Sequence, residues 1–127
     1  MPQSVIFVCQ SCSFSETQRD YDGDRGGLHL LRHLQQIHTT WALNSECKIV
    51  AAGCLSACNR RCVIALSVPQ KTTLMFGDLP ALESAPSILE LAEQYHTSPD
   101  GLIPRSDRPE ILQRGILARI PPLPFNE

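Results

Sequence analysis

The stretch ECKIVAAGCLSACNRRC, residues 46–62, decides the predicted fold, because a strand-like run here leads directly into a group of cysteines. Residues 46–52 are mostly apolar and are followed by a glycine, which predicts a strand that ends in a turn. Three thiols then occur within nine positions, at Cys54, Cys58 and Cys62. So tight a group predicts a site at the end of the strand, whereas buried structural cysteines are usually scattered.

A second group of cysteines follows another strand-like run near the N-terminus. Residues 4–8, SVIFV, are rich in β-branched and aromatic side chains and do not alternate with polar ones, which predicts a strand buried on both faces. Cys9 and Cys12 come directly after this strand. Residues 13–27 are polar and end in glycine-containing turns, so a loop is expected there.

Between the two strand-like runs lies the pattern of an amphipathic helix, over residues 28–41. Apolar residues recur at i, i+4, i+7 and i+11, at Leu30, Leu34, Ile37 and Trp41. A strand, helix, strand order predicts a parallel pair joined by a right-handed crossover. Because parallel strands end at the same edge of a sheet, both cysteine groups are expected to lie at that edge.

The rest of the chain extends this pattern to β-α-β-β-α. Residues 62–68 and 72–76 predict a hairpin that turns at residues 69–71. A second helix is predicted after Ser84, its expected cap, with Pro86 in the first turn. Its apolar face consists of Ile88, Leu89, Leu91, Ala92 and Tyr95.

The C-terminal part of the chain, residues 99–127, holds six of the ten prolines. It is predicted to be an extension of a domain formed by residues 1–98, with one short helix over residues 109–118. Its apolar residues need a covering surface, which is either the domain's own core or a second subunit. We prefer the first of these two alternatives.

Composition narrows the function classes. The 127 residues suit one domain with a single modest site. A net charge of −2, from 11 basic and 13 acidic residues without a basic block, argues against nucleic-acid binding. The N-terminal apolar run is too short for a signal peptide, and no run is long enough for a membrane helix, so a cytoplasmic protein is predicted. In that reducing compartment six cysteines indicate metal or redox chemistry.

Four thiolates can hold either a 2Fe-2S cluster or a structural zinc ion, so ligand number does not decide between them. Zinc ribbons usually use two C-x2-C knuckles on hairpins. Here one group is C-x2-C, at Cys9 and Cys12, and the other is C-x3-C, at Cys54 and Cys58. Both follow predicted parallel strands, which is poor geometry for zinc knuckles.

This order of elements and cysteines resembles the thioredoxin-like 2Fe-2S ferredoxins, whose first cysteine ends the first strand and whose last two form a C-x3-C. The resemblance implies that Cys9, Cys54 and Cys58 are cluster ligands and that Cys12 is the available second ligand. In that family a longer stretch separates the first two cysteines, so Cys62 is the substitute for Cys12. The resemblance also implies a homodimer.

A second resemblance covers nearly the whole chain. The segments FVCQSC, CLSACNRRCVIAL, FGDL and RPEILQRGILARIPPLP are together similar to an uncharacterised bacterial family described as predicted metal-binding proteins. None of these segments is a catalytic signature. This resemblance supports a metal and the fold, and it supplies no reaction.

We therefore predict a thioredoxin-like α/β domain with a proline-rich C-terminal extension, which binds a 2Fe-2S cluster through Cys9, Cys12, Cys54 and Cys58. It would act as a one-electron carrier or redox-responsive protein, and not as an enzyme. Its redox partner would be a protein that the sequence does not identify. The first alternative is a zinc-binding structural or metal-handling module on the same thiols.

A dithiol oxidoreductase that uses Cys9 and Cys12 is the third hypothesis. It ranks lower because the helix that would activate the thiol begins about fifteen residues later.

Two further motifs are weak. Asp20, Asp22 and Asp24 are spaced as in a calcium loop, but arginine stands where the loop needs glycine. His29 and His33 lie at i and i+4, without the intervening pattern of a zinc protease, and are expected at the edge of the helix.

Overall fold

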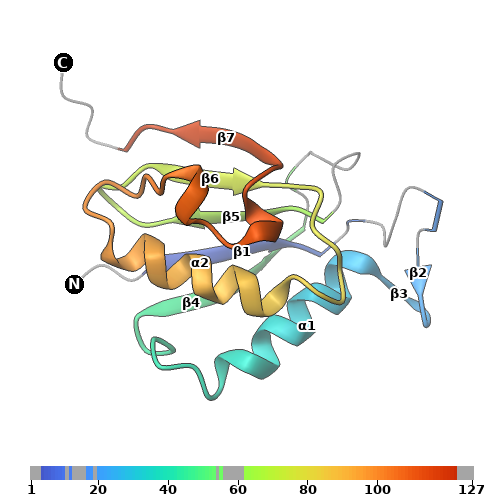
Figure 1. Cartoon of the computed structure of the whole chain (residues 1–127). Coiled ribbons are helices and arrows are strands. Elements are labelled where there is room, and N and C mark those ends of the chain that lie inside the picture. Colours follow the sequence, from blue (N-terminus) through green and yellow to red (C-terminus); the bar gives the residue numbers. More distant parts are fainter. Residues whose placement is uncertain are drawn as a thin grey trace.

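A computed structural model describes residues 4–10, 12, 17–18, 20–53, 55 and 62–122 of the chain. Elements in this part of the chain follow the order β1 (Ser4–Cys9), β2 (Asp20–Tyr21), β3 (Asp24–Arg25), α1 (Gly26–His38), β4 (Cys47–Ala52), β5 (Ile64–Ser67), β6 (Thr73–Phe76), α2 (Ala85–Thr97), η2 (Arg105–Asp107), η3 (Glu110–Leu112) and β7 (Ile116–Ile120). Figure 1 shows α1 and α2 side by side in front of a twisted sheet.

Within these residues a mixed sheet forms, with the strand order β4-β1-β5-β6-β7. β1 and β4 pair in parallel, from Ser4 opposite Cys47 to Cys9 opposite Ala52, which confirms the predicted parallel pair. The pairs β1–β5, β5–β6 and β6–β7 are antiparallel. The prediction that β1 is buried on both faces is only partly right, because Val5 and Phe7 are half-buried while Ile6 and Val8 are fully buried.

The first helix begins and ends earlier than its sequence pattern predicts. α1 buries Leu30, Leu31 and Leu34 against the sheet, as the apolar periodicity indicates. Trp41, expected on the helix, lies beyond its end at His38, and its indole Nε1 donates a 2.7 Å hydrogen bond to Glu93 Oε1 of α2. The indole therefore joins the two helices.

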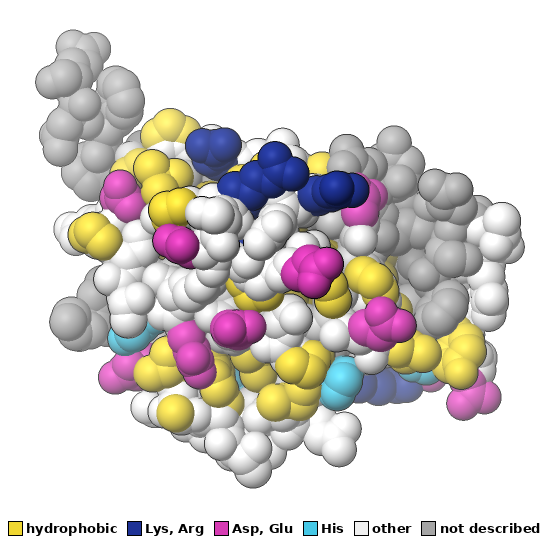
Figure 2. Space-filling view, viewed as in Figure 1, with side chains coloured by type: hydrophobic (Ala, Val, Ile, Leu, Met, Phe, Trp, Pro, Cys, Tyr) yellow, Lys and Arg dark blue, Asp and Glu magenta, His cyan; other side chains and the backbone are white. Residues whose placement is uncertain are grey.

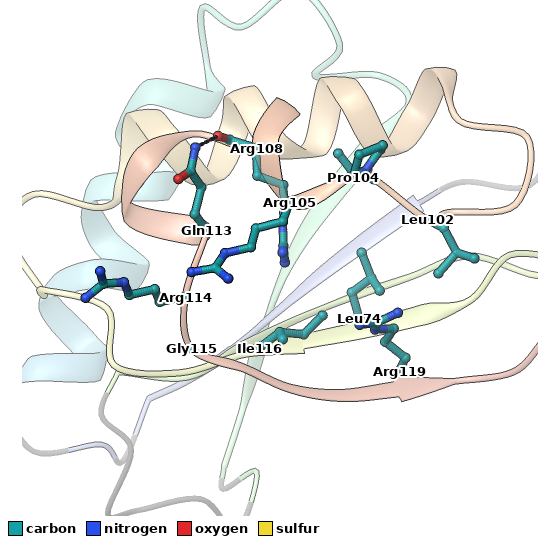
Figure 3. Close-up of a pocket in the computed structure, with 11 residues that line it drawn as sticks. Leu74, Leu102, Pro104, Arg105, Arg108, Gln113, Arg114, Gly115, Ile116 and Arg119 are labelled. Carbon is teal, nitrogen blue, oxygen red and sulfur yellow. Dashed lines mark hydrogen bonds between the residues drawn. The ribbon is translucent and has the colours of Figure 1, made fainter.

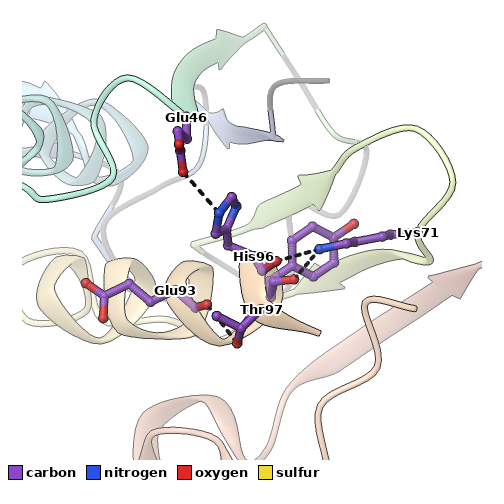
Figure 4. Close-up of polar contacts among 6 residues, drawn as sticks. Glu46, Lys71, Glu93, His96 and Thr97 are labelled. Carbon is purple, nitrogen blue, oxygen red and sulfur yellow. Dashed lines mark hydrogen bonds and ion pairs between the residues drawn. The ribbon is translucent and has the colours of Figure 1, made fainter. Parts of the chain in front are cut away.

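The second helix is fastened at its C-terminal end by the β5–β6 loop. Lys71 Nζ donates to the carbonyl oxygens of Tyr95 and His96, at 2.8 and 2.9 Å (Figure 4). A cation there satisfies carbonyls that have no partner within the helix. At the other end Ser84 is the N-cap residue, as predicted, but its hydroxyl donates to the Pro80 carbonyl, 2.7 Å away, and does not accept a bond from the helix.

The C-terminal part of the chain folds differently from its prediction. The expected helix over residues 109–118 is wrong, because only the short η3 forms there and β7 follows it. Gly115, with φ +79°, turns the chain between them, and β7 pairs with β6. Leu112 is fully buried in the core. The proposed boundary after residue 98 is not tested and stays a prediction.

The segment predicted as a loop between Cys12 and α1 contains a small hairpin, in which β2 pairs with β3. Asp22 and Gly23 form its turn, both with positive φ.

In the described ranges no helix is long and apolar enough to span a bilayer. The core lies between the sheet and the two helices, and its largest fully buried side chains include Tyr95, Phe76, Ile6, Leu30, Leu34, Ile64, Leu66, Leu79, Ile88 and Leu91.

Candidate metal centre

The first cysteine of the candidate site is the last residue of β1. The Cys9 backbone N–H donates to the Val63 carbonyl at 3.1 Å, and the next N–H, of Gln10, donates to the Ala52 carbonyl at 3.0 Å. The end of β1 is thus held from both sides, by the residues before β5 and by the end of β4. Ala52 lies two positions before Cys54 in the sequence, so both cysteine groups follow strand ends at one edge of the sheet.

Cys62 lies at the same edge. Its backbone forms a reciprocal pair of hydrogen bonds with Leu79, of 2.9 and 3.3 Å, just beyond the paired ends of β5 and β6. Cys9, Cys12 and Cys62 are buried, with exposed fractions of 0, 0 and 1 %. The three thiols come from two segments far apart in the sequence, the end of β1 with the residues after it and the residues before β5, and the pairing of β1 with β5 brings these segments together.

The electrostatics of Cys12 show that these thiols interact. Burial raises the pKa of the Cys12 thiol far above its ordinary value. The hydrogen bond that this thiol donates to the Cys9 sulfur and the negative charge of Cys9 raise the pKa further. The Val63 backbone N–H lowers this pKa by bonding to the sulfur, and the charge of Cys62 raises it. Cys12 therefore keeps its proton at neutral pH unless a metal ion replaces that proton.

The N-terminus of α1 packs directly on this site. The Gly27 backbone N–H donates to the Cys12 carbonyl at 2.9 Å. A Cβ on Gly27 would lie 2.0 Å from the Cys9 carbonyl oxygen, so only glycine permits this approach. A helix N-terminus carries a partial positive charge, so α1 favours negative charge on the neighbouring sulfurs.

The predicted site residues fall into two sets. Cys9 and Cys12 are brought together, and Cys62, the predicted substitute, interacts with Cys12. Cys54 and Cys58 lie outside the described residues.

Cys47, at the start of β4, is a buried thiol whose pKa is raised to about 11 by burial. Its burial at the start of a strand fits a structural thiol of the core. Nothing in the described surroundings of Cys47 associates it with the three thiols at the other end of β1.

The weaker motifs are engaged in local contacts. Asp20 forms an ion pair with Arg25 at 3.4 Å, and Asp24 forms one with Arg32 at 2.6 Å. The His29 ring forms a hydrogen bond with the Tyr21 carbonyl. Among the described residues no three His, Cys, Asp or Glu side chains have the geometry of a metal site. The donor chemistry nevertheless fits iron or zinc, because Cys9, Cys12 and Cys62 are buried sulfur donors, which are soft ligands, and Cys12 interacts with each of the other two.

Sequence reasoning missed two contributors to this site. The Gly26-Gly27 pair was interpreted as part of a loop, although it forms the first turn of α1 against the cysteines. The separation of about fifteen residues between Cys12 and the helix also suggests that the helix lies away from Cys12. In the structure the intervening segment brings the start of α1 back into contact with the Cys12 backbone. Two adjacent glycines just before an amphipathic pattern were the available signal for such a close approach.

Comparisons with known proteins agree with this fold. A family model described as "Protein of unknown function (DUF1636)" matches residues 6–122. A solved structure of a thioredoxin-like [2Fe-2S] ferredoxin from Aquifex aeolicus is similar, with a TM-score of 0.59 and 17 % sequence identity, over 98 % of this chain and 100 % of that chain. A search of curated sequences finds no match. The structural similarity confirms the predicted thioredoxin-like fold.

Proposed function

We propose that this chain, which belongs to the DUF1636 family of proteins of unknown function, binds a 2Fe-2S cluster and acts as a one-electron carrier or redox-responsive protein. The observation that carries the proposal is the buried set of Cys9, Cys12 and Cys62 at one edge of the sheet, in which Cys12 interacts with both of the others. The similar fold belongs to a protein described as a 2Fe-2S ferredoxin, which supports this choice of cofactor.

The proposed ligands are Cys9, Cys12, Cys54 and Cys58, with Cys62 as the substitute for Cys12. Four thiolates are the usual protein supply for such a cluster. The interaction of Cys62 with Cys12 supports the view that either thiol can reach the same metal. When bound, the cluster would supply one-electron redox chemistry, which the protein's own side chains lack.

The described residues would stabilise and orient the thiolates. Val63 donates its backbone N–H to the Cys12 sulfur, and the N-terminus of α1 lies against the backbone of Cys9 and Cys12. Hydrogen bonds to sulfur and nearby positive charge both favour the more negative, reduced state. Burial opposes this effect, because it disfavours net charge. The balance of these contributions sets the reduction potential.

Two observations favour this function over a dithiol oxidoreductase. Cys9 and Cys12 are both completely buried, whereas an exchanging thiol must be reached by its substrate. The raised pKa of Cys12 also keeps its thiol protonated and unreactive. We accordingly propose a cytoplasmic, non-enzymatic protein with a protein redox partner.

We also propose the homodimer that the ferredoxin resemblance implies, because the edge strands of the sheet expose apolar side chains. The two outer strands of the sheet, β4 and β7, carry exposed apolar side chains in the described part of the chain, Val50 at 36 % and Ile120 at 53 % exposure. Edge strands with such residues can pair with a second copy.

The ligand assignment is tested by replacing each cysteine with alanine and measuring iron and acid-labile sulfide in the anaerobically purified protein. We expect about two irons and two sulfides per chain in the wild type, and a loss of most of both in Cys9→Ala, Cys54→Ala and Cys58→Ala. Cys47→Ala is the matched control. It removes a buried thiol remote from the cluster site and should retain the wild-type content.

Cys12→Ala and Cys62→Ala distinguish the two candidates for the remaining ligand. If only Cys12→Ala loses iron and sulfide, Cys12 is the remaining ligand. If only Cys62→Ala loses them, Cys62 is the remaining ligand. Wild-type iron in all five variants would contradict a cysteine-ligated cluster. About one zinc without sulfide in the wild type would instead indicate the zinc-binding module.

A further inference from the structure

A cavity of about 630 Å³ lies between the C-terminal segment and the sheet, apart from the cysteine edge. Leu74 of β6 and Ile116 of β7 line its apolar side, and the residues around η2 and η3 line the other. In Figure 3 Arg105 and Arg108 extend from the η2–η3 segment toward these strands. The volume is that of a small-molecule site.

The cavity is strongly basic. Four of the chain's eleven basic residues line it, Arg105, Arg108, Arg114 and Arg119. None of the described lining residues is acidic, and the arginine ion pairs formed in the described ranges are those of Arg25 and Arg32, far from this segment in the sequence. Figure 2 shows Lys and Arg side chains gathered in a band near the top of this face, with most acidic side chains below them.

Arg108 differs from the other three because it is buried, with an exposed fraction of 8 %. Its guanidinium Cζ lies 5.6 Å from the centroid of the Phe76 ring, so one face of the group packs on the core. Its buried Nε has no hydrogen-bond partner in the described structure. A buried donor without a partner costs free energy, so a ligand that accepted this bond would be favoured.

The backbone around Arg108 is held firmly. Gln113 Nε2 donates to the Arg108 carbonyl at 3.2 Å, and Gln94 Nε2 of α2 donates to the Asp107 carbonyl. Burial lowers the pKa of Arg108, and the charges of Arg119 and Arg105 lower it further. Arg105 and Arg119 therefore each repel the guanidinium of Arg108, and a bound anion would relieve that repulsion.

The turn at Gly115 completes the cavity. Gly115 has φ +79°, and a Cβ there would lie 2.5 Å from the Gly77 carbonyl oxygen. After this tight turn the chain runs along β6 as β7. Arg114 lies just before the turn and Arg119 lies on β7, and both line the cavity.

We propose that this cavity binds a small organic molecule that carries a multiply charged oxyanion, either a phosphate group or two or more carboxylates. Guanidinium groups match both chemistries, because each presents parallel N–H donors that fit two oxygens. Arg108 is the interior donor, and Arg105 and Arg119 supply charge from the rim. Leu74 and Ile116 contact the uncharged part of the ligand.

The test is isothermal titration of the full-length protein with pyrophosphate and, separately, with citrate, at constant ionic strength set with sodium chloride. We expect at least one of them to bind with a Kd below about 1 mM. Binding of pyrophosphate alone assigns a phosphate ligand, and binding of citrate alone assigns a polycarboxylate. Binding of both supports the shared oxyanion chemistry. Binding of neither overturns the proposal and leaves water as the partner of Arg108 Nε.

Variants separate this site from general attraction of anions. Arg105→Gln and Arg119→Gln change exposed side chains and should each weaken binding about tenfold, while Arg108→Lys retains the charge but loses the paired donors and should weaken binding at least as much. Arg32→Gln removes an exposed arginine of α1 outside the cavity, as the matched control, and should change the Kd less than about twofold. Equal weakening in Arg32→Gln, or unchanged affinity in Arg105→Gln and Arg119→Gln, would contradict the proposed site.

Discussion

At the scale of single residues, Gly27 decides how close α1 comes to the cysteines. The space that its missing side chain leaves is occupied by the Cys9 carbonyl, 2.0 Å from the position of a Cβ. The Gly27 N–H bond to the Cys12 carbonyl depends on the same approach. The positions of Cys9 and Cys12 are thus coupled to one glycine in a helix.

We expect Gly27→Ala to destabilise the fold by about 1–3 kcal/mol, because a methyl group cannot be accommodated against the Cys9 backbone without moving β1 or α1. The variant should also purify with less iron than the wild type. Chemical denaturation and iron analysis measure the two effects.

Gly53→Ala is the matched control, because no described residue lies within 4 Å of a Cβ at that position. It should keep both stability and iron content close to those of the wild type. If Gly27→Ala behaves like Gly53→Ala, the close packing of α1 on the cysteines is not important for the site.

At the scale of elements, the helices and strands that could be predicted are those whose residue pattern is contained within the element itself. The stripe of Leu30, Leu34 and Ile37 identified α1, and the apolar runs identified β1 and β4. The end of α1 was placed three residues late, because Trp41 continues the apolar spacing although it packs from beyond the helix against α2.

The C-terminal elements could not be predicted in the same way. Ile111, Leu112, Ile116 and Leu117 have a spacing compatible with a helix, but Gly115 adopts a positive φ between the two pairs. β7 depends on its pairing with β6, a tertiary contact that no local pattern shows. The β2–β3 hairpin has two-residue strands, which are too short for any periodicity.

The end of α2 supports a prediction about pH. The Tyr95 hydroxyl donates to the Thr72 carbonyl at 2.7 Å, and burial raises the pKa of this phenol to about 12. The unfolded chain releases this proton near pH 10, so the folded state binds it more tightly. The stabilisation is complete below pH 10 and is lost as the pH rises through 12. By pH 11 we expect the free energy of unfolding to fall by about 1 kcal/mol through this group.

Tyr95→Phe isolates this contribution, because other groups that titrate in the same range are present in both proteins. The variant should be about 1 kcal/mol less stable at pH 8, where the hydrogen bond is lost, and the difference should shrink between pH 9 and 11. Urea denaturation across this range measures it. If the difference in the free energy of unfolding between the two proteins stays constant over this range, the pKa of Tyr95 is not raised in the folded state.

At the scale of the whole molecule, the two candidate sites use different parts of one sheet. Cys62 is joined to Leu79 by two backbone hydrogen bonds, and Gly77, two residues before Leu79, donates to the carbonyl of Gly115 in the basic cavity. The segment after β6 therefore connects the cysteine edge with the turn that shapes the cavity. Both sites depend on the same strand pairing.

The two sites differ in how visible they are in the sequence. Clustered cysteines indicate a metal or redox site directly, because few other roles need several thiols close together. The four arginines are irregularly spaced, and only the fold brings them together. Arg105 and Arg119 lie on η2 and β7, whereas Arg108 and Arg114 follow η2 and η3. The interaction of Cys62 with Cys12 was likewise left open by spacing, since it depends on how β5 is placed beside β1.

The central claim, a one-electron cluster held by cysteines, is tested most directly by reductive titration of the anaerobically purified wild-type protein. Visible absorbance and electron paramagnetic resonance would be followed as dithionite is added. We predict a coloured protein that bleaches on taking up about one electron per chain and becomes paramagnetic as it does so. A colourless protein that takes up no electrons and stays silent, with stoichiometric zinc, would contradict the account.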